Sequence, residues 1–200
     1  MDGIAWASSA MVAARARLDI ATGNLANVST DGFQKAVARG VLTANGVVIE
    51  RSTSHKHGAL QHTGRQYDLA IVGDGAFQVR GTDGRVIETR DGAFTPDRDG
   101  VLRDDARRAL LGERGLVRVV DGASIDAHGV VVVNGKESNR IALPQGSSVR
   151  SGFVESANVD AIGEMVTVLA AQRSFESAEK AVAAIDSTRQ KAANDVARIK

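Results

Sequence analysis

Three of the chain's four histidines lie close together in the sequence, at His55, His57 and His62. In an extended segment, His55 and His57 would point to the same side, which is a spacing that a metal site can use. Zinc sites usually need a third or fourth firm ligand and hydrogen-bonded groups behind the ligands, and the surrounding sequence offers neither. We therefore interpret the three histidines as part of a solvated connector, and we predict no metal site.

Asp97 and Asp99 stand before Gly100 in a pattern that faintly resembles part of a calcium loop. The match fails at both ends, because Thr95 occupies the first ligand position and Ala106 the position of the bidentate glutamate. A turn between two strands of a hairpin explains the pattern better.

Four arginines follow this turn, but acidic residues interleave with them and only one aromatic residue is near. Sites for single-stranded nucleic acid combine positive charge with aromatic side chains on which bases stack. We therefore interpret the group as a mixed, solvated face or a protein contact. It consists of Arg103, Arg107, Arg108 and Arg114.

The composition excludes several classes of function. The 200 residues include 25 Lys and Arg against 24 Asp and Glu, which leaves no surplus of positive charge to neutralise phosphates. The absence of cysteine excludes a disulfide framework, thiolate metal ligands and a thiol nucleophile. No phosphate-binding loop, dinucleotide fingerprint or nucleophile elbow occurs. We predict no catalytic residue, no cofactor, no small-molecule substrate and no nucleic-acid partner.

Apolar runs in the sequence are far shorter than the roughly 20 residues of a membrane-spanning helix, so we predict no membrane insertion. The first lysine or arginine is Arg15, so the basic start of a secretory signal peptide is missing. If the protein leaves the cytosol, we expect it to use another route.

Both ends of the chain contain few of the 21 glycines and repeat apolar residues at heptad spacing. A narrow apolar stripe needs a partner, so we predict that the two terminal helices pair as a coiled coil or pack on neighbouring subunits. Arg189, the one polar member, either extends into solvent at a frayed helix end or pairs with an acidic group across a subunit interface. The two series are Ile4, Ala7, Met11, Ala14, Leu18, Ala21 and Leu25, and Val168, Ala171, Phe175, Ala178, Val182, Ile185, Arg189, Ala192, Val196 and Ile199.

The middle of the chain has the pattern of short strands and tight turns. Asp-Gly and Asn-Gly pairs separate short apolar runs, and Asp83, Asp91 and Asp99 recur at the spacing of successive hairpins. We therefore predict an α+β fold in which N- and C-terminal helices pair and an antiparallel β domain lies between them in the sequence. The expected boundaries are an N-terminal helix over 1–27, an extended connector over 28–66, a central β domain over 67–150 and a C-terminal helical segment over 151–200.

Residues 24–33 read N-L-A-N-V-S-T-D-G-F, which closely resembles the N-L-A-N-x-x-T-x-G-[FY] signature of bacterial flagellar rod and hook proteins. Leu25 completes the apolar series, and the two asparagines can offer side-chain amides to a helix end that lacks partners. Asp31-Gly32 then turns the chain towards Phe33. Further blocks resemble the family in the same order, at residues 63–64 with 68–79, 89–94, 151–160 and 172–176.

The resemblance implies a structural subunit of the flagellar basal-body rod, a hollow shaft in the periplasm or cell-wall space that links the membrane motor to the hook. It implies stacking with copies of itself and with other rod and hook axial proteins, with the terminal helices lining the inner tube. It also implies export through the flagellar type III apparatus.

Within the family, residues 111–113 and 173–176 look most like a short proximal rod protein. A distal rod or hook-type axial subunit is the alternative within the same class. A periplasmic or cell-wall enzyme, or a glycan-binding module, is the alternative from another class.

The apolar series and the resembling blocks together identify the residues that we expect at the assembly interface. The N-terminal group is Ile4, Met11, Leu18, Asn24, Leu25, Asn27, Thr30, Gly32 and Phe33. The C-terminal group is Val168, Gln172, Arg173, Phe175, Glu176, Val182 and Ile185.

Overall fold

The computed structural model describes residues 3–44 and 46–198, and the chain divides into two compact units. The first, which we call the helical unit, comprises Met1–Asn27, Lys35–His55 and Val159–Lys200. The second, the β unit, comprises Val28–Gln34 and Lys56–Asn158. Each unit is therefore built from segments that lie far apart in the sequence.

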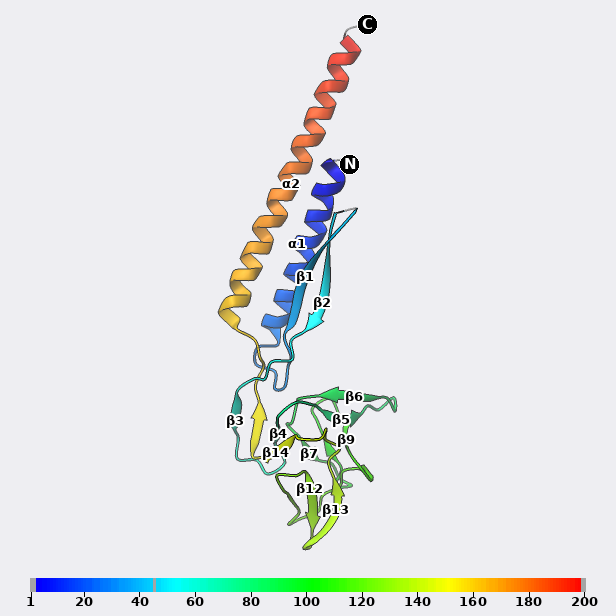
Figure 1. The fold of residues 1–200 in the computed structure, drawn as a ribbon, viewed down its shortest axis with the longest axis vertical. Coiled ribbons are helices and arrows are strands. Elements are labelled where there is room, and N and C mark those ends of the chain that lie inside the picture. The colour runs from blue at the N-terminus through cyan, green and yellow to red at the C-terminus, as the bar shows by residue number, and fades with distance from the viewer. Residues whose placement is uncertain (1–2, 45, 199–200) are drawn as a thin grey trace. The chain divides into compact units, whose positions relative to one another are not determined.

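Two helices pack against each other in the helical unit (Figure 1). Helix α1 spans Gly3–Ala26 and helix α2 spans Ala161–Arg198. The start of α1 lies beside the middle of α2, where Ile185 is the side chain next to Gly3. The end of α1 lies beside the start of α2, where Asn24 Nδ2 donates to Glu164 Oε2 at 3.1 Å. The helices therefore run antiparallel, and the prediction of a helix at each end of the chain is confirmed.

The predicted apolar series marks the less exposed face of each helix. Every α1 residue of the series is buried or half-buried, and so is every α2 residue of the series from Val168 to Ile185. The most deeply buried members are alanines, namely Ala14, Ala21, Ala171 and Ala178, whose small side chains allow the helix axes to approach closely.

The α2 series is not covered along its whole length. Helix α1 reaches only as far as Ile185, and residues 186–194 of α2, including Arg189 and Ala192, are exposed. The predicted positions Val196 and Ile199 lie outside the residues whose side chains the structure describes. We call residues 186–194 the α2 extension.

Residues 28–66 are not the extended connector that the sequence predicts. They contain an antiparallel hairpin of β1 (Ala36–Thr43) and β2 (Gly46–Thr53), which packs on α1 in the helical unit (Figure 1). Val47 N donates to Ser9 Oγ of α1 at 3.4 Å, and Gly40 lies against the Arg17 guanidinium. The helical unit thus has three layers in the order α2, α1, hairpin.

The β unit contains the remaining strands, and all their pairings are antiparallel, as predicted. The largest sheet has the order β6-β5-β9-β8-β7 with β10 paired to β9; the smaller ones are β11-β12-β13, β14-β4 and β15-β3. The strands are β3 (Leu60–His62), β4 (Leu69–Val72), β5 (Phe77–Arg80), β6 (Val86–Thr89), β7 (Thr95–Pro96), β8 (Leu102–Arg103), β9 (Ala109–Gly112), β10 (Gly115–Leu116), β11 (Ser124–Ile125), β12 (Val130–Val133), β13 (Lys136–Arg140), β14 (Ser148–Ser151) and β15 (Phe153–Glu155).

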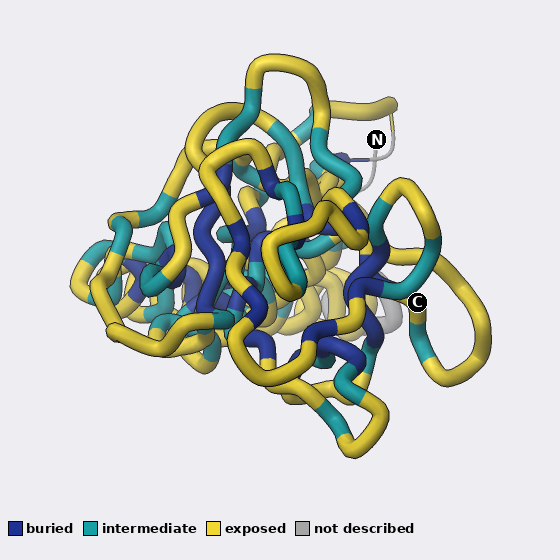
Figure 2. The backbone as a smooth tube through the Cα atoms, turned by 90° about the horizontal axis from the view of Figure 1, so that it is seen from below, coloured by how far each residue is buried: buried dark blue, intermediate teal, exposed yellow. Residues whose placement is uncertain are grey.

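One apolar core holds these short sheets together. Phe77 and Phe94 meet edge to face with ring centroids 5.4 Å apart, and Leu69, Leu102 and Leu110 are fully buried in the same cluster. Figure 2 shows the buried backbone positions grouped inside and the exposed turns outside. The β unit therefore has a larger share of buried apolar side chains than the alanine-lined helix pair.

The predicted hairpin turns are correct in part. Asp83-Gly84 joins β5 to β6, and Asn134-Gly135 joins β12 to β13 with both residues at positive φ, as a tight hairpin turn requires. Asp91-Gly92 is not a hairpin turn. Gly92 instead lies against β4, where its carbonyl accepts a hydrogen bond from Leu69 N at 2.9 Å. The two backbones are so close that no space remains for a side chain at this position.

We expect the α2 extension to exchange its amide hydrogens much faster than the part of α2 between Glu164 and Ile185. An isolated helical segment of this length is marginal in water, whereas the earlier turns are supported by α1. Hydrogen exchange measured by mass spectrometry on the dilute full-length chain tests this. Equal protection along the whole of α2 would contradict the expectation.

Candidate assembly interface

Asn24 joins three elements of the helical unit through one buried side chain. Its Oδ1 accepts a hydrogen bond from Ala36 N at 2.8 Å, and its Nδ2 donates to Ala36 O at 2.8 Å. The same Nδ2 donates to Glu164 Oε2, and Glu164 Oε1 also forms an ion pair with Lys35. Both Asn24 and Glu164 are almost completely buried. The amide therefore ties the end of α1 to the start of β1 and to the first turn of α2.

Asn27 acts within its own helix end, as the sequence predicts. Its Nδ2 donates to the carbonyl of Gly23 at 2.8 Å, and its backbone N donates to the carbonyl of Asn24 at 3.1 Å. These bonds satisfy carbonyls that the end of a helix leaves without a partner. The two asparagines of the predicted signature thus have different tasks.

The rest of the signature belongs to the β unit rather than to the helix pair. Gly32 has φ +66°, and a Cβ there would collide with the backbone of Asp91, so the position requires glycine. Gly32 N donates to Glu155 O at 2.6 Å, and Phe33 O accepts from Asn158 N at 3.2 Å. Phe33 N donates to Thr30 O at 3.2 Å, which closes the turn.

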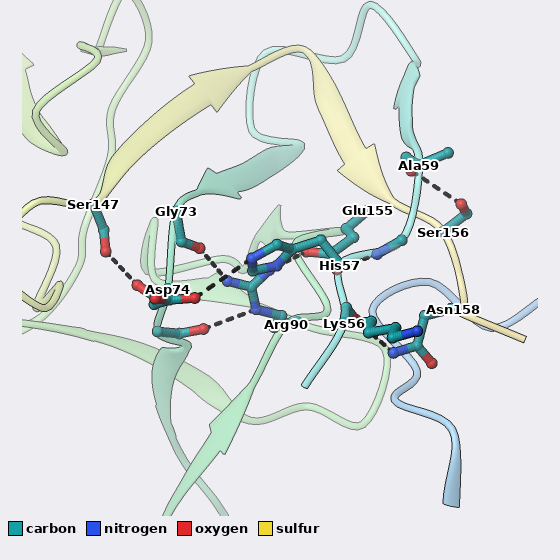
Figure 3. Close-up of polar contacts among 12 residues, drawn as sticks. Lys56, His57, Ala59, Gly73, Asp74, Arg90, Ser147, Glu155, Ser156 and Asn158 are labelled. Atoms are coloured by element: carbon teal, nitrogen blue, oxygen red, sulfur yellow. Dashed lines mark hydrogen bonds and ion pairs between the residues drawn. The ribbon is translucent and has the colours of Figure 1, made fainter. Parts of the chain in front are cut away.

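A buried ion pair that the sequence analysis missed lies in the β unit, between Arg90 and Glu155 (Figure 3). Arg90 Nη1 lies 2.7 Å from Glu155 Oε2, and both side chains are almost fully buried. Arg90 also donates from Nε to Gly75 O at 2.8 Å and from Nη2 to Gly73 O at 2.5 Å. Glu155 Oε1 accepts from Gly58 N at 2.8 Å. The pair therefore joins the chain entering the β unit, the turn after β4, and the last strand β15.

Both members of this ion pair lie inside blocks that resemble the family, at residues 89–94 and 151–160. No local pattern links them, because they are far apart in the sequence and belong to different elements. The sequence signalled this pair only in that Arg90 and Glu155 are charged residues that belong to no apolar or turn pattern.

Within the β unit, the structure gives His57 and His62 roles other than metal binding. Arg90 Nη1 lies 2.5 Å from His57 Nδ1, and His57 Nε2 lies 3.5 Å from Asp74 Oδ1 (Figure 3). His62 contacts Phe153 edge to face at 4.9 Å. Both side chains are exposed, as the sequence predicts, but His62 belongs to strand β3 rather than to a connector. In the part of the chain that the structure describes, no group of three or more His, Asp or Glu side chains could hold a metal ion.

The Asp97 turn and the arginine group have the structures that the sequence predicts. Asp97 Oδ1 accepts from Asp99 N and Val101 N, each at 2.9 Å, as in a hairpin turn. Ion pairs of Arg103 with Asp97 and of Arg108 with Asp104, each at 2.6 Å, make the basic group a face of mixed charge.

The C-terminal group of predicted interface residues divides by exposure. Val168, Phe175, Val182 and Ile185 are half-buried on the face with the alanines, whereas Gln172, Arg173 and Glu176 are exposed. In the N-terminal group, Ile4, Met11, Leu18 and Leu25 are half-buried on the facing side of α1. Among the described residues, no helix is long and apolar enough to cross a membrane.

Two family profiles match the helices together with short flanking segments of the β unit, and the relatives align over most of the chain. A family profile described as "Flagella basal body rod protein" matches residues 4–34, and one described as "Flagellar basal body rod FlgEFG protein C-terminal" matches residues 150–195. Flagellar basal-body rod protein FlgG of Agrobacterium fabrum is 24% identical, over 93% of this chain and 96% of that protein. FlgG of Bacillus subtilis is 28% identical, over 89% of this chain and 92% of that protein.

The chain belongs to the flagellar basal-body rod and hook protein family. It is a structural rod subunit of the flagellar basal body, as the sequence analysis predicts. A further relative, the flagellar hook protein FlgE of Brucella abortus, is 32% identical over 72% of this chain but only 38% of its own length. The alignments therefore cover nearly all of the two FlgG proteins and little more than a third of the hook protein.

Two aspartates of the β unit are electrostatically unfavourable in the folded state. Burial, reinforced by the carboxylates of Asp104, Asp105 and Asp31, raises the pKa of Asp91 above its usual 3.8, although the hydrogen bond from Ala93 N opposes the shift. Burial and the nearby Asp68 likewise raise the pKa of Asp31. Because the folded state holds the proton more tightly than the unfolded state, each ionised carboxylate lowers stability at neutral pH.

We expect Asp91→Asn to raise the melting temperature of the full chain at pH 7, since Asn keeps an oxygen for the Ala93 N–H and removes the charge. The increase should shrink as the pH falls through the raised pKa, because the wild-type carboxyl is then protonated as well. Thermal unfolding between pH 3 and 8 measures this, with Asp121→Asn at an exposed position as the control. A lower melting temperature for Asp91→Asn at pH 7 would contradict the electrostatic assignment.

We expect Glu155→Gln to destabilise the full chain by about 3–5 kcal/mol, because it leaves the buried Arg90 charge without its counterion. Replacing both residues by Met should cost less than the two single changes together. Urea unfolding provides the free energies, and Arg85→Gln, in the exposed pair with Asp83, is the matched control. Equal small effects of Glu155→Gln and Arg85→Gln would show that the buried pair does not hold the segments together.

Proposed function

We propose that this structural subunit assembles into the hollow flagellar rod through its terminal helices, which pair as a coiled coil. The observation that supports this most directly is that the two segments matching the family profiles, residues 4–34 and 150–195, contain α1 and most of α2. The hydrogen bond between Asn24 and Glu164 joins them. Both helices thus lie almost entirely within segments that match the family profiles.

The antiparallel arrangement and the heptad series support coiled-coil pairing. Alanine at Ala14, Ala21, Ala171 and Ala178 buries little apolar area, on a scale of roughly 25 cal/mol per Å². A single intramolecular pair of this kind has little stability of its own. Contacts with further subunits would supply the remaining burial, which suits a subunit that completes its order in the polymer.

The coverage of the relatives favours the rod over the hook. The alignments span 96% and 92% of the two FlgG proteins but 38% of the hook protein. A proximal position within the rod, which residues 111–113 and 173–176 suggest, remains a prediction. The proposed partners are further copies of this chain, other rod and hook axial proteins, and the flagellar type III export apparatus. The proposed role includes no catalytic step.

We expect Phe175→Ala to be secreted but to enter rods poorly, with weak or absent motility. Phe175 is the one aromatic residue of the described α2 series and lies between the buried Ala171 and Ala178. A fully buried Phe→Ala change costs about 3–5 kcal/mol, and the half-buried position of Phe175 makes the cost smaller in the single subunit. The defect is repeated in every subunit of the polymer.

Complementation of a null strain, with secretion, rod assembly and swimming scored separately, tests the proposal. Ser174→Ala, at the exposed neighbouring position, is the matched control and should behave as wild type. Normal rods and normal swimming with Phe175→Ala would remove this residue from the interface. Absence of the wild-type protein from purified basal bodies would contradict the proposed function as a whole.

A further inference from the structure

We propose that an exposed apolar stripe on α2 binds the outward face of the β1–β2 hairpin of a second copy of this chain. The outer stripe consists of Ile162, Met165, Val166 and Leu169. The hairpin outer face consists of Val37, Val41 and Val48, with Arg39 and Glu50 between them. This inference rests on the proposed function, since it specifies how copies would contact one another in the rod.

The outer stripe has the spacing of a helix interface but no partner among the described residues of its own helical unit. Ile162, Met165 and Leu169 follow one another at helical intervals of three and four, and Val166 lies beside Met165 on the same side of the helix. In sequence order the four are 75%, 51%, 60% and 56% exposed. At 100° per residue, the stripe lies on the side of α2 away from the buried Ala171 and Ala178. Helix α1 therefore cannot cover it.

The hairpin outer face is exposed for a similar reason. Side chains alternate across a strand, so the face containing Ala36 and Gly40 is directed at α1 and the other face is directed away. On that other face Val41 is paired with Val48, which is 51% exposed, and Val37 is 38% exposed. A two-stranded hairpin is marginally stable by itself, and further packing on its outer face would stabilise it.

The two surfaces lie on opposite sides of the helical unit, because α1 lies between α2 and the hairpin (Figure 1). They cannot meet within one chain, but copies placed side by side would bring the stripe of one against the hairpin of the next. Such a contact uses two different patches, so it does not close after two subunits and instead continues into a ring or a helical array. A shaft built from many copies requires this type of contact.

The charges next to the two surfaces are also compatible with pairing. Along α2 the stripe continues into Arg173 and Glu176, which are exposed. On the hairpin outer face, Arg39 and Glu50 are directly opposite each other in the strand register. Each surface thus presents one cation and one anion to the other, and neither would bury an unpaired excess of one sign.

The absence of cysteine from the chain makes a disulfide test direct. We expect a full-length variant carrying both Val166→Cys and Val48→Cys to give a ladder of disulfide-linked multimers in basal bodies after mild oxidation. Either single variant alone should stay monomeric. The control combines Val166→Cys with Val120→Cys, an exposed valine of the β unit, and should give no ladder.

Three results would overturn the inference: basal bodies that contain the double variant without a ladder, efficient dimers of Val166→Cys alone, or cross-links to a different protein. The first of these would leave the proposed function intact, because the protein would still be found in the rod. If the cysteine variants do not assemble, the incorporation of Met165→Glu into rods tests the inference instead. This variant should be secreted with unchanged helix content yet fail to incorporate, whereas Ser174→Glu on another face should incorporate; normal incorporation of Met165→Glu would overturn the inference.

Discussion

The buried amide of Asn24 is the interaction on which the helical unit depends. Little apolar area is buried between α1, the β1–β2 hairpin and α2. Apolar packing alone therefore fixes their relative positions only weakly. Asn24 fixes these positions because its amide matches both polar groups of Ala36 and still reaches Glu164. An unsatisfied amide at this depth would cost about 1–3 kcal/mol, so any arrangement that separates the three elements is disfavoured.

In the β unit, the buried ion pair between Arg90 and Glu155 has a comparable role. The apolar core of this unit does not extend to the segment around Gly58, and the carboxylate of Glu155 holds that segment instead. Buried ion pairs contribute little net stability compared with apolar packing, but they disfavour alternative arrangements strongly, because breaking one leaves a charge without a partner. In both units, therefore, apolar burial stabilises the fold, and a buried polar contact fixes how the segments are placed against one another.

The sequence predicted the parts of the fold that follow from local periodicity. Both helices and their facing sides could be read from residues such as Leu18 and Phe175, because helical spacing records which face is buried. The hairpin could not be read this way, because Arg39, Gly40 and Glu50 interrupt the alternation that marks a strand. The outer stripe was missed for another reason: a heptad analysis follows one apolar face, and α2 has two.

The candidate site could be predicted where a residue contacts its neighbours in the sequence. It could not be predicted where the contacting residues are far apart in the sequence. Asn27 caps its own helix, and that role follows from its position at a helix end. The contacts of Asn24 with Ala36 and Glu164, and of Arg90 with Glu155, depend on which strands and helices become neighbours. Such pairs are invisible to any local pattern, and Gly32 shows the same limit because its need for glycine comes partly from Asp91.

The bond between Asn24 and Glu164 also constrains the order in which the chain can fold. It closes a loop that contains the whole β unit, and contacts of such long sequence separation form late because the entropy of loop closure opposes them. The β unit contains all its strands between residues 60 and 155, so it can form while the last helix is still being synthesised. Until α2 emerges, the first helix can pack only on the β1–β2 hairpin, and the alanine-rich face that α2 later covers stays exposed. During that interval the helical unit is incomplete, and synthesis of α2 completes it.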